Sequence, residues 1–387
     1  MDGNPDLVSS TSLRFRAPDF RFGDGVVEAL PAALDRLGVQ RPLVVTDEGV
    51  AAAGVLDDAL AAYDGPYTRY DAATEPSTDD FADLPDDVDG VVAVGGGSCL
   101  DTAKVAAILL THDADPASLL GVGKLTEPVA PLVAVPTTSG TGSQSTQTAV
   151  VHHEGVKRGI SDERMRPDVA LVDPSLTFGL PRTVTARSGF DGFVHALESL
   201  TARDYRWVEP RPITYQGANP VSRSFSRRAL HLMAGNLERA TFDGADRDAR
   251  RAVSLGSHLA GLAFSNAGLG AVHALASAVG GMVDRPHGEC LAVSVEPGLR
   301  YNLPVRREEY AAVARDLGVG DDAEDLIAAA TRLRDSLALP ESFAAFGLDE
   351  SDVDEIVEKT LVQERRIKTN PREVTEDLRA VVAASFA

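Results

Sequence analysis

The stretch Val91–Lys104, VVAVGGGSCLDTAK, decides the fold. It begins with a continuous apolar run, passes through Gly95, Gly96 and Gly97, and continues as a helical pattern. Glycines let the backbone turn sharply and approach a ligand, and the free N–H groups at the start of a helix attract negative charge. The stretch therefore predicts a buried strand, a turn that can hold a phosphate group, and a helix.

The same pattern extends on both sides of the glycine turn, from residue 41 to residue 136. RPLVVTDEG (41–49) and PLVAVPTT (131–138) are further apolar runs, and AAAGVLDDALAAY (51–63) is an amphipathic segment. Apolar runs without alternation indicate parallel strands that are buried on both faces of a sheet. We therefore predict that residues 1–180 form an α/β dinucleotide-binding domain with a Rossmann-like parallel sheet.

After residue 180 the strand pattern ends and helical periodicities replace it. They occupy residues 226–240, 248–264, 323–339 and 352–362. A proline can open a helix at its first turn, so the boundary is placed at Pro181. Residues 181–387 are predicted to form an all-helical domain, in which Asp204–Asn219, rich in prolines, is a long loop between two helices.

Length and composition describe a chain that folds into sizeable domains. Its 387 residues are 44% hydrophobic, which is too apolar for an intrinsically disordered chain. There are 58 acidic and 37 basic residues, and the net charge of −21 argues against nucleic-acid and anionic-membrane partners. The acidic excess is spread along the chain, so we expect a halophilic protein whose surface stays hydrated in concentrated salt.

The sequence also indicates a compartment. No apolar run approaches the roughly 18 residues of a membrane-spanning helix. The first ten residues, MDGNPDLVSS, lack the basic-then-apolar layout of a signal peptide. Cys99 and Cys290 are too few for a disulfide framework, which fits a reducing environment. We therefore expect a cytoplasmic protein.

Two further features bear on a nucleotide. The loop Thr137–Ser143 follows an apolar strand, and its hydroxyls can donate to phosphate or ribose oxygens. Asp47 closes another strand, where a carboxylate can accept from ribose hydroxyls and repel a 2′-phosphate. Plainer roles remain open: Asp47 can simply cap a helix, and Ser98 with Asp101 can form a capping box.

Histidines supply the candidates for metal binding. Asp191 and His195 in SGFDGFVHALES are four residues apart, so one helical face presents both side chains. His273 and His287 lie far along the chain, in a helical run and in a Pro-Gly turn respectively. Other histidines have plainer interpretations: His231 and His258 as core residues, and His152 and His153 as a polar turn.

The motifs GGGSCLDTAK, PTTSGTGS, SGFDGFVHALES, GAVHAL and PHGE occur in this order. The chain resembles the iron-containing (group III) alcohol dehydrogenases, a family related in fold to glycerol dehydrogenase and dehydroquinate synthase. The resemblance extends from Arg21 to Leu378. It implies a dehydroquinate synthase-like fold in which an α/β dinucleotide-binding domain precedes an all-α metal-binding domain.

The resemblance also implies the ligands of two cofactors. A divalent metal, Fe2+ or alternatively Zn2+, is bound by one aspartate and three histidines, which fall on Asp191, His195, His273 and His287. NAD, in preference to NADP, is bound by residues that match the family's dinucleotide site: Asp47, Gly96, Gly97, Ser98, Asp101, Thr137, Thr138, Lys157 and Leu176.

Two residues depart from the family pattern. Gln144 stands where a glutamate usually follows PTTSGTGS, which removes a charge near the cofactor loop. Ser277 stands four residues after His273, where the family often has a second histidine that relays a proton. A serine is no base near neutral pH, so the usual proton relay is in doubt.

The implied activity is reversible hydride transfer between NAD and a primary alcohol or hydroxy acid. The expected partners are a small alcohol or aldehyde substrate and further copies of the chain, which assemble into a dimer or larger homo-oligomer. TVTARSGFD and RPITYQGANP also resemble the hydroxyacid-oxoacid transhydrogenase branch, which oxidises 4-hydroxybutyrate with a retained nicotinamide. Two competing hypotheses are a lyase or cyclase that uses NAD transiently, as in dehydroquinate synthase, and a catalytically silent binding protein. The particular alcohol, the physiological direction and the metal stay open.

Overall fold

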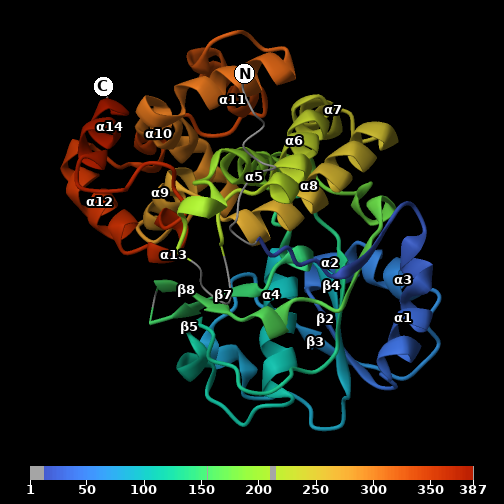
Figure 1. The fold of residues 1–387 in the computed structure, drawn as a ribbon. Helices are drawn as coiled ribbons and strands as arrows, with labels where there is room; N and C mark the ends of the chain where they lie inside the picture. The colour runs from blue at the N-terminus through green and yellow to red at the C-terminus, as the bar shows by residue number, and fades with distance from the viewer. Residues whose placement is uncertain (1–12, 155, 210–214, 387) are drawn as a thin grey trace.

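The computed structural model describes residues 13–154, 156–209 and 215–386. Its two halves differ in architecture. The first half, blue to green in Figure 1, is built around a sheet, and the second half, yellow to red, is helical. This confirms the predicted α/β half followed by an all-helical half.

A six-stranded parallel sheet forms the centre of the first half. Its strand order is β1-β9-β6-β4-β2-β3. Every residue of the four inner strands is buried, so these strands show no polar alternation. The bounds are β1 Asp19–Phe22, β2 Pro42–Thr46, β3 Thr68–Asp71, β4 Gly90–Gly95, β6 Leu132–Pro136 and β9 Val169–Val172.

Short helices and turns flank this sheet. Their bounds are α1 Leu30–Leu37, α2 Glu48–Ala52, α3 Val55–Leu60 and α4 Gly97–Leu109, with 3-10 turns η2 Val26–Ala29, η3 Thr78–Phe81, η4 Pro116–Leu119, η5 Ser143–Ser145, η6 Glu163–Met165 and η7 Pro174–Thr177. The amphipathic segment 51–63 forms parts of two helices, because Gly54 adopts a left-handed conformation (φ 75°) between α2 and α3. That conformation ends one helix and redirects the chain into the next.

A second, smaller sheet was not predicted. It contains β5 Gly121–Val122, β7 Thr148–His153 and β8 Val156–Ser161, in the order β5-β8-β7. The prediction of a polar turn at His152 and His153 is wrong, because both residues lie in β7 and pair with β8. The half-buried residues of β7 lack the continuous apolar run that identified the main strands.

Ten helices and three 3-10 turns build the described part of the second half. Their bounds are α5 Arg182–Thr201, η8 Tyr205–Trp207, α6 Pro220–Ala234, α7 Leu237–Phe242, α8 Arg247–Ala267, α9 Ala271–Gly280, α10 His287–Leu317, α11 Ala323–Ser336, η9 Phe343–Phe346, η10 Glu350–Asp352, α12 Val353–Leu361, α13 Glu364–Ile367 and α14 Leu378–Ala384. α5 lies centrally and packs against α6, α8 and α10 (Figure 1). It begins directly after the predicted boundary residue Pro181.

Between α5 and α6, residues 202–209 and 215–219 are irregular apart from η8, which agrees with the loop predicted for Asp204–Asn219 in its described part. Residues 210–214, which include the start of the RPITYQGANP motif, lie outside the described residues.

Among the described residues, no single helix is long and apolar enough to cross a membrane. α8 and α9 meet the length and composition criteria only as a pair, and the pair is bent by 99°.

Candidate metal centre and cofactor loops

Side chains from three helices converge inside the helical half. One ligand atom each from Asp191, His273 and His287 can be chosen so that all three lie within 4.8 Å of one another. His195 lies beside this group: its Nδ1 is 3.3 Å from Asp191 Oδ1, and its ring stacks on that of His273 with centroids 4.5 Å apart. The structure thus brings together all four residues that the sequence analysis named as metal ligands, with His195 at the edge.

Local structure explains this convergence. Asp191 and His195 lie one helical turn apart on α5, as their spacing predicted. His287 is the first residue of α10, directly after Pro286. A Cβ on the following Gly288 would lie 2.3 Å from the Arg187 carbonyl oxygen. Only glycine therefore lets the start of α10 approach α5 so closely.

Three polar atoms of this cluster lack hydrogen-bond partners within the described residues. Asp191 Oδ1, His195 Nδ1 and His273 Nε2 are buried and accept or donate no hydrogen bond. Burying an unpaired carboxylate or imidazole nitrogen costs free energy, and native proteins avoid it. One cation contacted by these atoms removes the penalty, and imidazole nitrogens with a carboxylate suit first-row divalent metals. The residues therefore fit the implied metal.

Burial sets the protonation state of two of the imidazoles. It lowers the pKa of His195 to about 3 and that of His287 to about 4. Both rings are therefore neutral near pH 7 and keep a lone pair for a metal. Burial also acts to lower the pKa of His273, but Asp191 and Glu198 outweigh it and raise that pKa. A proton and a metal cation compete for this position.

Glu198 is a site residue that the sequence analysis missed. Its Oε2 accepts from His273 Nδ1 at 2.5 Å, and its Oε1 accepts from the Val272 backbone N–H at 2.8 Å. The first bond leaves Nε2 of His273 facing Asp191, at 3.4 Å from its Oδ1. A carboxylate on the far nitrogen commonly orients a metal-binding histidine. The spacing of Asp191, His195 and Glu198 on one helical face was the available signal.

The cofactor candidates lie at the carboxyl edge of the main sheet. From β2 the chain passes to β3 on one side, and later to β4 on the other side of β2. The strand order therefore reverses between β2 and β4, and open α/β sheets bind ligands at such a reversal. Asp47 follows β2 and Gly96 follows β4, so the two flank this crevice.

The glycine turn leaves a helix start open to an anion. α4 begins after Gly96 without a side-chain cap. The alternative of a capping box formed by Ser98 and Asp101 does not hold, because the N-cap residue is Gly96 and the Ser98 hydroxyl donates to the Thr74 carbonyl. A Cβ on Gly97 would lie 2.8 Å from Thr141 Cγ2, and one on Gly96 would lie 3.3 Å from Thr138 Cγ2. The backbone N–H groups are thus free to hold a phosphate.

Asp47 caps a helix and makes a second contact. Its Oδ1 accepts from the Val50 N–H at 2.8 Å, which is the capping role left open by the sequence. Its Oδ2 accepts from Cys99 Sγ at 3.1 Å. Asp47 lies close to the glycine turn, since a Cβ on Gly95 would be 3.9 Å from Oδ2. A cap and a ribose partner therefore remain compatible.

Asp101 supports the second loop rather than facing a ligand. Its carboxylate accepts from the Ser143 hydroxyl at 2.6 Å and from the Val150 N–H at 2.9 Å. The buried Lys104 ammonium donates to Ser143 and to Thr146. Burial raises the pKa of Asp101 and lowers that of Lys104 to about 8. This network ties the Thr137–Ser143 loop to α4.

Three other predicted cofactor residues have different surroundings. Thr137 is buried, and its N–H donates to the Gly95 carbonyl, which joins the two loops. Lys157 on β8 pairs with Glu75 at 2.6 Å and lowers the pKa of His287 through its charge. Leu176 in η7 is buried in the core on one face of the sheet.

The two residues that depart from the family pattern have structural partners. Gln144 is buried, with its Nε2 3.4 Å from His258 Nδ1. The Ser277 hydroxyl donates to the His273 carbonyl of the preceding turn at 2.8 Å. This bond gives Ser277 a role within α9. The core interpretation of His258 is confirmed, since it is fully buried, but that of His231 is wrong, because His231 is partly exposed and pairs with Asp316.

The second loop connects the crevice to the metal cluster. A Cβ on Gly140 would lie 2.2 Å from the Ser188 carbonyl oxygen of α5, and the Gly140 backbone hydrogen-bonds His195. Gly142 packs equally closely against Gly261 of α8. A phosphate-binding edge and a carboxylate–imidazole cluster therefore share one loop, an arrangement typical of a metal-dependent enzyme that uses a dinucleotide.

Comparison with known proteins identifies the family. The model of the iron-containing alcohol dehydrogenases matches residues 17–174, and that of their C-terminal domain matches residues 185–385. The chain belongs to the iron-containing alcohol dehydrogenase family.

Individual relatives match over nearly the whole chain. A 4-hydroxybutyrate dehydrogenase of Cupriavidus necator is 34% identical and covers 91% of this chain and 93% of its own. A mitochondrial hydroxyacid-oxoacid transhydrogenase of Rattus norvegicus is 33% identical and covers 95% and 88%. The crystal structure of a 1,3-propanediol oxidoreductase superposes with a TM-score of 0.90 at 32% identity, covering 97% and 100%.

Proposed function

We propose that this enzyme transfers hydride reversibly between NAD and a small primary alcohol or hydroxy acid, with a divalent metal, Fe2+ or Zn2+, held by Asp191, His195, His273 and His287. One observation carries the proposal. Buried and unpartnered donor atoms for a cation lie against the same loop that closes an uncapped, anion-binding helix start.

The two cofactors supply the reactive chemistry when bound: the metal stabilises negative charge on the substrate oxygen, and the nicotinamide accepts or gives the hydride. The chain provides position. The free N–H groups at the start of α4 would hold the pyrophosphate, and Gly140 keeps the nucleotide loop against α5. Glu198 fixes the His273 ring, and its neighbours exclude water from a cluster in which Asp191 and His273 are at most 3% exposed.

Proton release follows from the residues around the cluster. Ser277 donates its hydroxyl proton to the His273 carbonyl, and a serine hydroxyl does not accept a second proton near neutral pH. Burial lowers the pKa of His195 to about 3 and that of His287 to about 4, so at pH 7 each ring is a neutral imidazole without the second, ionising proton. We propose that water or the cofactor ribose carries the proton out.

The substrate class rests on the relatives. The Cupriavidus protein is named for 4-hydroxybutyrate, and the Rattus protein is named for exchange between a hydroxy acid and an oxo acid. We propose a short hydroxy acid as the substrate to test beside simple alcohols and diols. Transhydrogenation with retained nicotinamide is the second candidate, and the similarity to the Rattus enzyme favours it.

The test is a steady-state screen on metal-free and Fe2+-loaded enzyme with NAD and NADP. Simple alcohols, 1,3-propanediol and 4-hydroxybutyrate are the substrates, and a parallel series adds 2-oxoglutarate as acceptor. We expect Fe2+-dependent NADH release that chelation abolishes. Hydroxy-acid oxidation only in the presence of 2-oxoglutarate, without free NADH, identifies the transhydrogenase. Absence of both activities in the metal-loaded enzyme would overturn the proposal and favour the hypothesis of a lyase or cyclase that uses NAD transiently.

We further propose a cytoplasmic, salt-adapted homo-oligomer. The net charge of −21 supports salt adaptation, because repulsion between acidic side chains is screened at high ionic strength. Unfolding midpoints that rise steeply with KCl concentration support this, and a flat dependence contradicts it. Light scattering at the same concentrations measures the assembly.

A further inference from the structure

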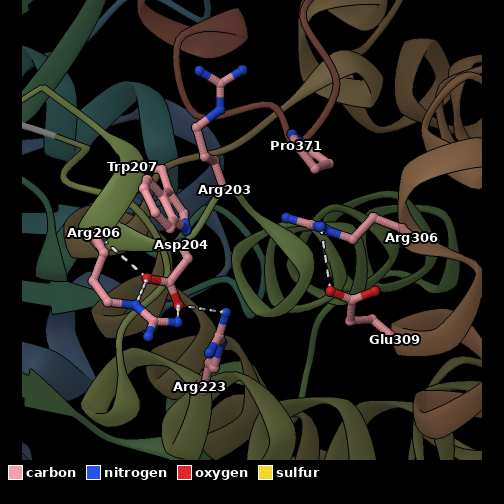
Figure 2. Close-up of a pocket in the computed structure, with 8 residues that line it drawn as sticks. All are labelled: Arg203, Asp204, Arg206, Trp207, Arg223, Arg306, Glu309 and Pro371. Atoms are coloured by element: carbon pink, nitrogen blue, oxygen red, sulfur yellow. Dashed lines mark hydrogen bonds and ion pairs between the residues drawn. The ribbon is translucent and has the colours of Figure 1, made fainter. Parts of the chain in front are cut away.

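A second polar pocket lies outside the proposed catalytic site. It has a volume of about 490 Å³, within the range of small-molecule sites. Figure 2 shows the side chains that surround it, among them Arg203, Asp204, Arg206, Trp207, Arg223 and Arg306. It includes no metal-cluster residue. Thr201, the last residue of α5, lies six positions after His195, about 9 Å along the helix, and the lining begins after it at Arg203.

The charge of this pocket opposes that of the chain. Four arginines face two acids, Asp204 and Glu309, which leaves a net charge of +2 in a protein whose net charge is −21. Cations gathered on an acidic protein concentrate small anions locally. A long nucleic acid is excluded, since the surrounding acidic surface repels it.

The acids are already neutralised by particular arginines. Asp204, which is 11% exposed, accepts from Arg206 Nε at 2.7 Å and lies 3.3 Å from Arg223 NH2. Glu309 pairs with Arg306 at 3.3 Å. These pairs hold the wall of the pocket in place, and among the four lining arginines only Arg203 lies outside them.

Arg306 is a built part of the fold. Its side chain is only 16% exposed, and its Nε donates to the Thr201 carbonyl at 2.9 Å, at the end of α5. Burial lowers the pKa of Arg306, so a charged guanidinium there is held at a cost. An anion in the pocket offsets that cost.

Arg203 differs from the other three arginines. Among residues 13–154, 156–209 and 215–386, its guanidinium has no ion pair or hydrogen bond, and no dashed line reaches it in Figure 2. Its planar fork of donors matches a phosphate or carboxylate group. Trp207 lines the same pocket with 74% of its surface exposed, which offers an indole face for stacking.

We propose that this pocket binds a small multivalent oxyanion, either a nucleoside diphosphate or a tricarboxylate, through Arg203 and the arginine-rich wall. The shared chemistry is two or more anionic oxygen groups that neutralise the excess charge. This site goes beyond the proposed function and does not depend on metal or on hydride transfer.

The test uses the fluorescence of Trp207 to report binding in the pocket, because Trp207 is the only tryptophan in the sequence. The full chain is titrated with pyrophosphate, ADP and citrate at constant ionic strength set with KCl, and indole fluorescence is followed. We expect a saturable change with at least one of them. Tighter binding of ADP than of pyrophosphate identifies a nucleotide stacked on Trp207, and preference for citrate identifies a carboxylate ligand.

Arg203→Gln is the diagnostic variant. Loss of a charge-assisted bidentate contact should weaken binding about tenfold to a hundredfold. Thermal unfolding should stay unchanged, since the Arg203 guanidinium has no partner in the described structure to lose, and its backbone bonds to Thr369 and Ala218 persist in the variant. Arg332→Gln, an exposed position on α11, is the matched control and should bind as the parent does. Equal affinity of Arg203→Gln and the parent, or no saturable change with any anion, would overturn the proposal. Equal affinity is also the result expected if ADP binds only at the glycine turn and not in this pocket.

Discussion

Glu198→Gln tests whether the carboxylate behind His273 prepares the metal site. Glu198 is 4% exposed and bonds His273 Nδ1 at 2.5 Å and the Val272 N–H at 2.8 Å. Glutamine keeps the shape and one accepting oxygen, so the Val272 bond can persist. What is lost is the negative charge opposite the His273 ring.

The expected size of this effect follows from that lost bond. A hydrogen bond to a charged group contributes about 1.5–3 kcal/mol. Changes of carboxylates behind metal-binding histidines cost roughly 10- to 100-fold in metal affinity, which corresponds to about 1.4–2.7 kcal/mol. The two estimates agree, so we expect the metal dissociation constant to rise by one to two orders of magnitude.

The assay is competition between the metal-free protein and a chromophoric chelator for Co2+ or Zn2+. Thermal unfolding of the metal-free variant should occur at a somewhat lower temperature than that of the parent, because the buried pair of Glu198 with His273 loses its charged acceptor. Glu296→Gln is the control, because Glu296 pairs with Arg300 on the exposed side of α10. An unchanged dissociation constant in Glu198→Gln would refute the positioning role.

Three further predictions concern single residues. His273→Ala should abolish metal retention and turnover but leave NADH binding by fluorescence titration nearly intact, because the glycine turn lies in the other half; unchanged turnover would contradict the ligand assignment. Asp47→Asn should keep the helix cap yet raise the use of NADP relative to NAD, and an unaltered cofactor ratio would reduce Asp47 to a cap. Burial lowers the pKa of His258 from 6.5 to about 3, so below pH 6.5 the unfolded chain takes up a proton that the folded chain excludes. As the pH falls from 6.5 towards 3, the free energy of unfolding should therefore decrease by about 1.4 kcal/mol per pH unit. His258→Asn should remove this contribution to the pH dependence of the unfolding free energy, measured by urea titration at several pH values.

The main strands were predictable because burial on both faces leaves an unbroken apolar run. β2, β4 and β6 each lie within such a run. β7 and β8 could not be predicted, because their sheet is small and half-buried. A strand that contains polar residues such as His152 has a sequence pattern similar to that of a turn. The broken helix at Gly54 had a visible cause, but periodicity alone does not show when a glycine turns left-handed.

Some residues of the candidate site could be predicted from spacing, some only from the family resemblance, and some not at all. Asp191 and His195 follow from helical spacing, whereas assigning His273 and His287 needed the family resemblance. Asp101 carries no mark in the sequence that separates a cofactor ligand from a loop support, and its bonds to Ser143 and Val150 appear only when β7 is in place. Glu198 was missed because its partner, His273, is 75 residues away along the chain.

Local patterns in the chain specify its elements: unbroken apolar runs that form buried strands, glycines that allow a tight turn, and a carboxylate and an imidazole one helical turn apart. Which of these elements meet depends on the packing of the whole chain. The reversal between β2 and β4, the approach of Gly140 to α5 and the arginine-lined pocket all depend on contacts between distant segments. Local sequence cannot specify such contacts, because they arise from packing that buries apolar surface throughout the chain.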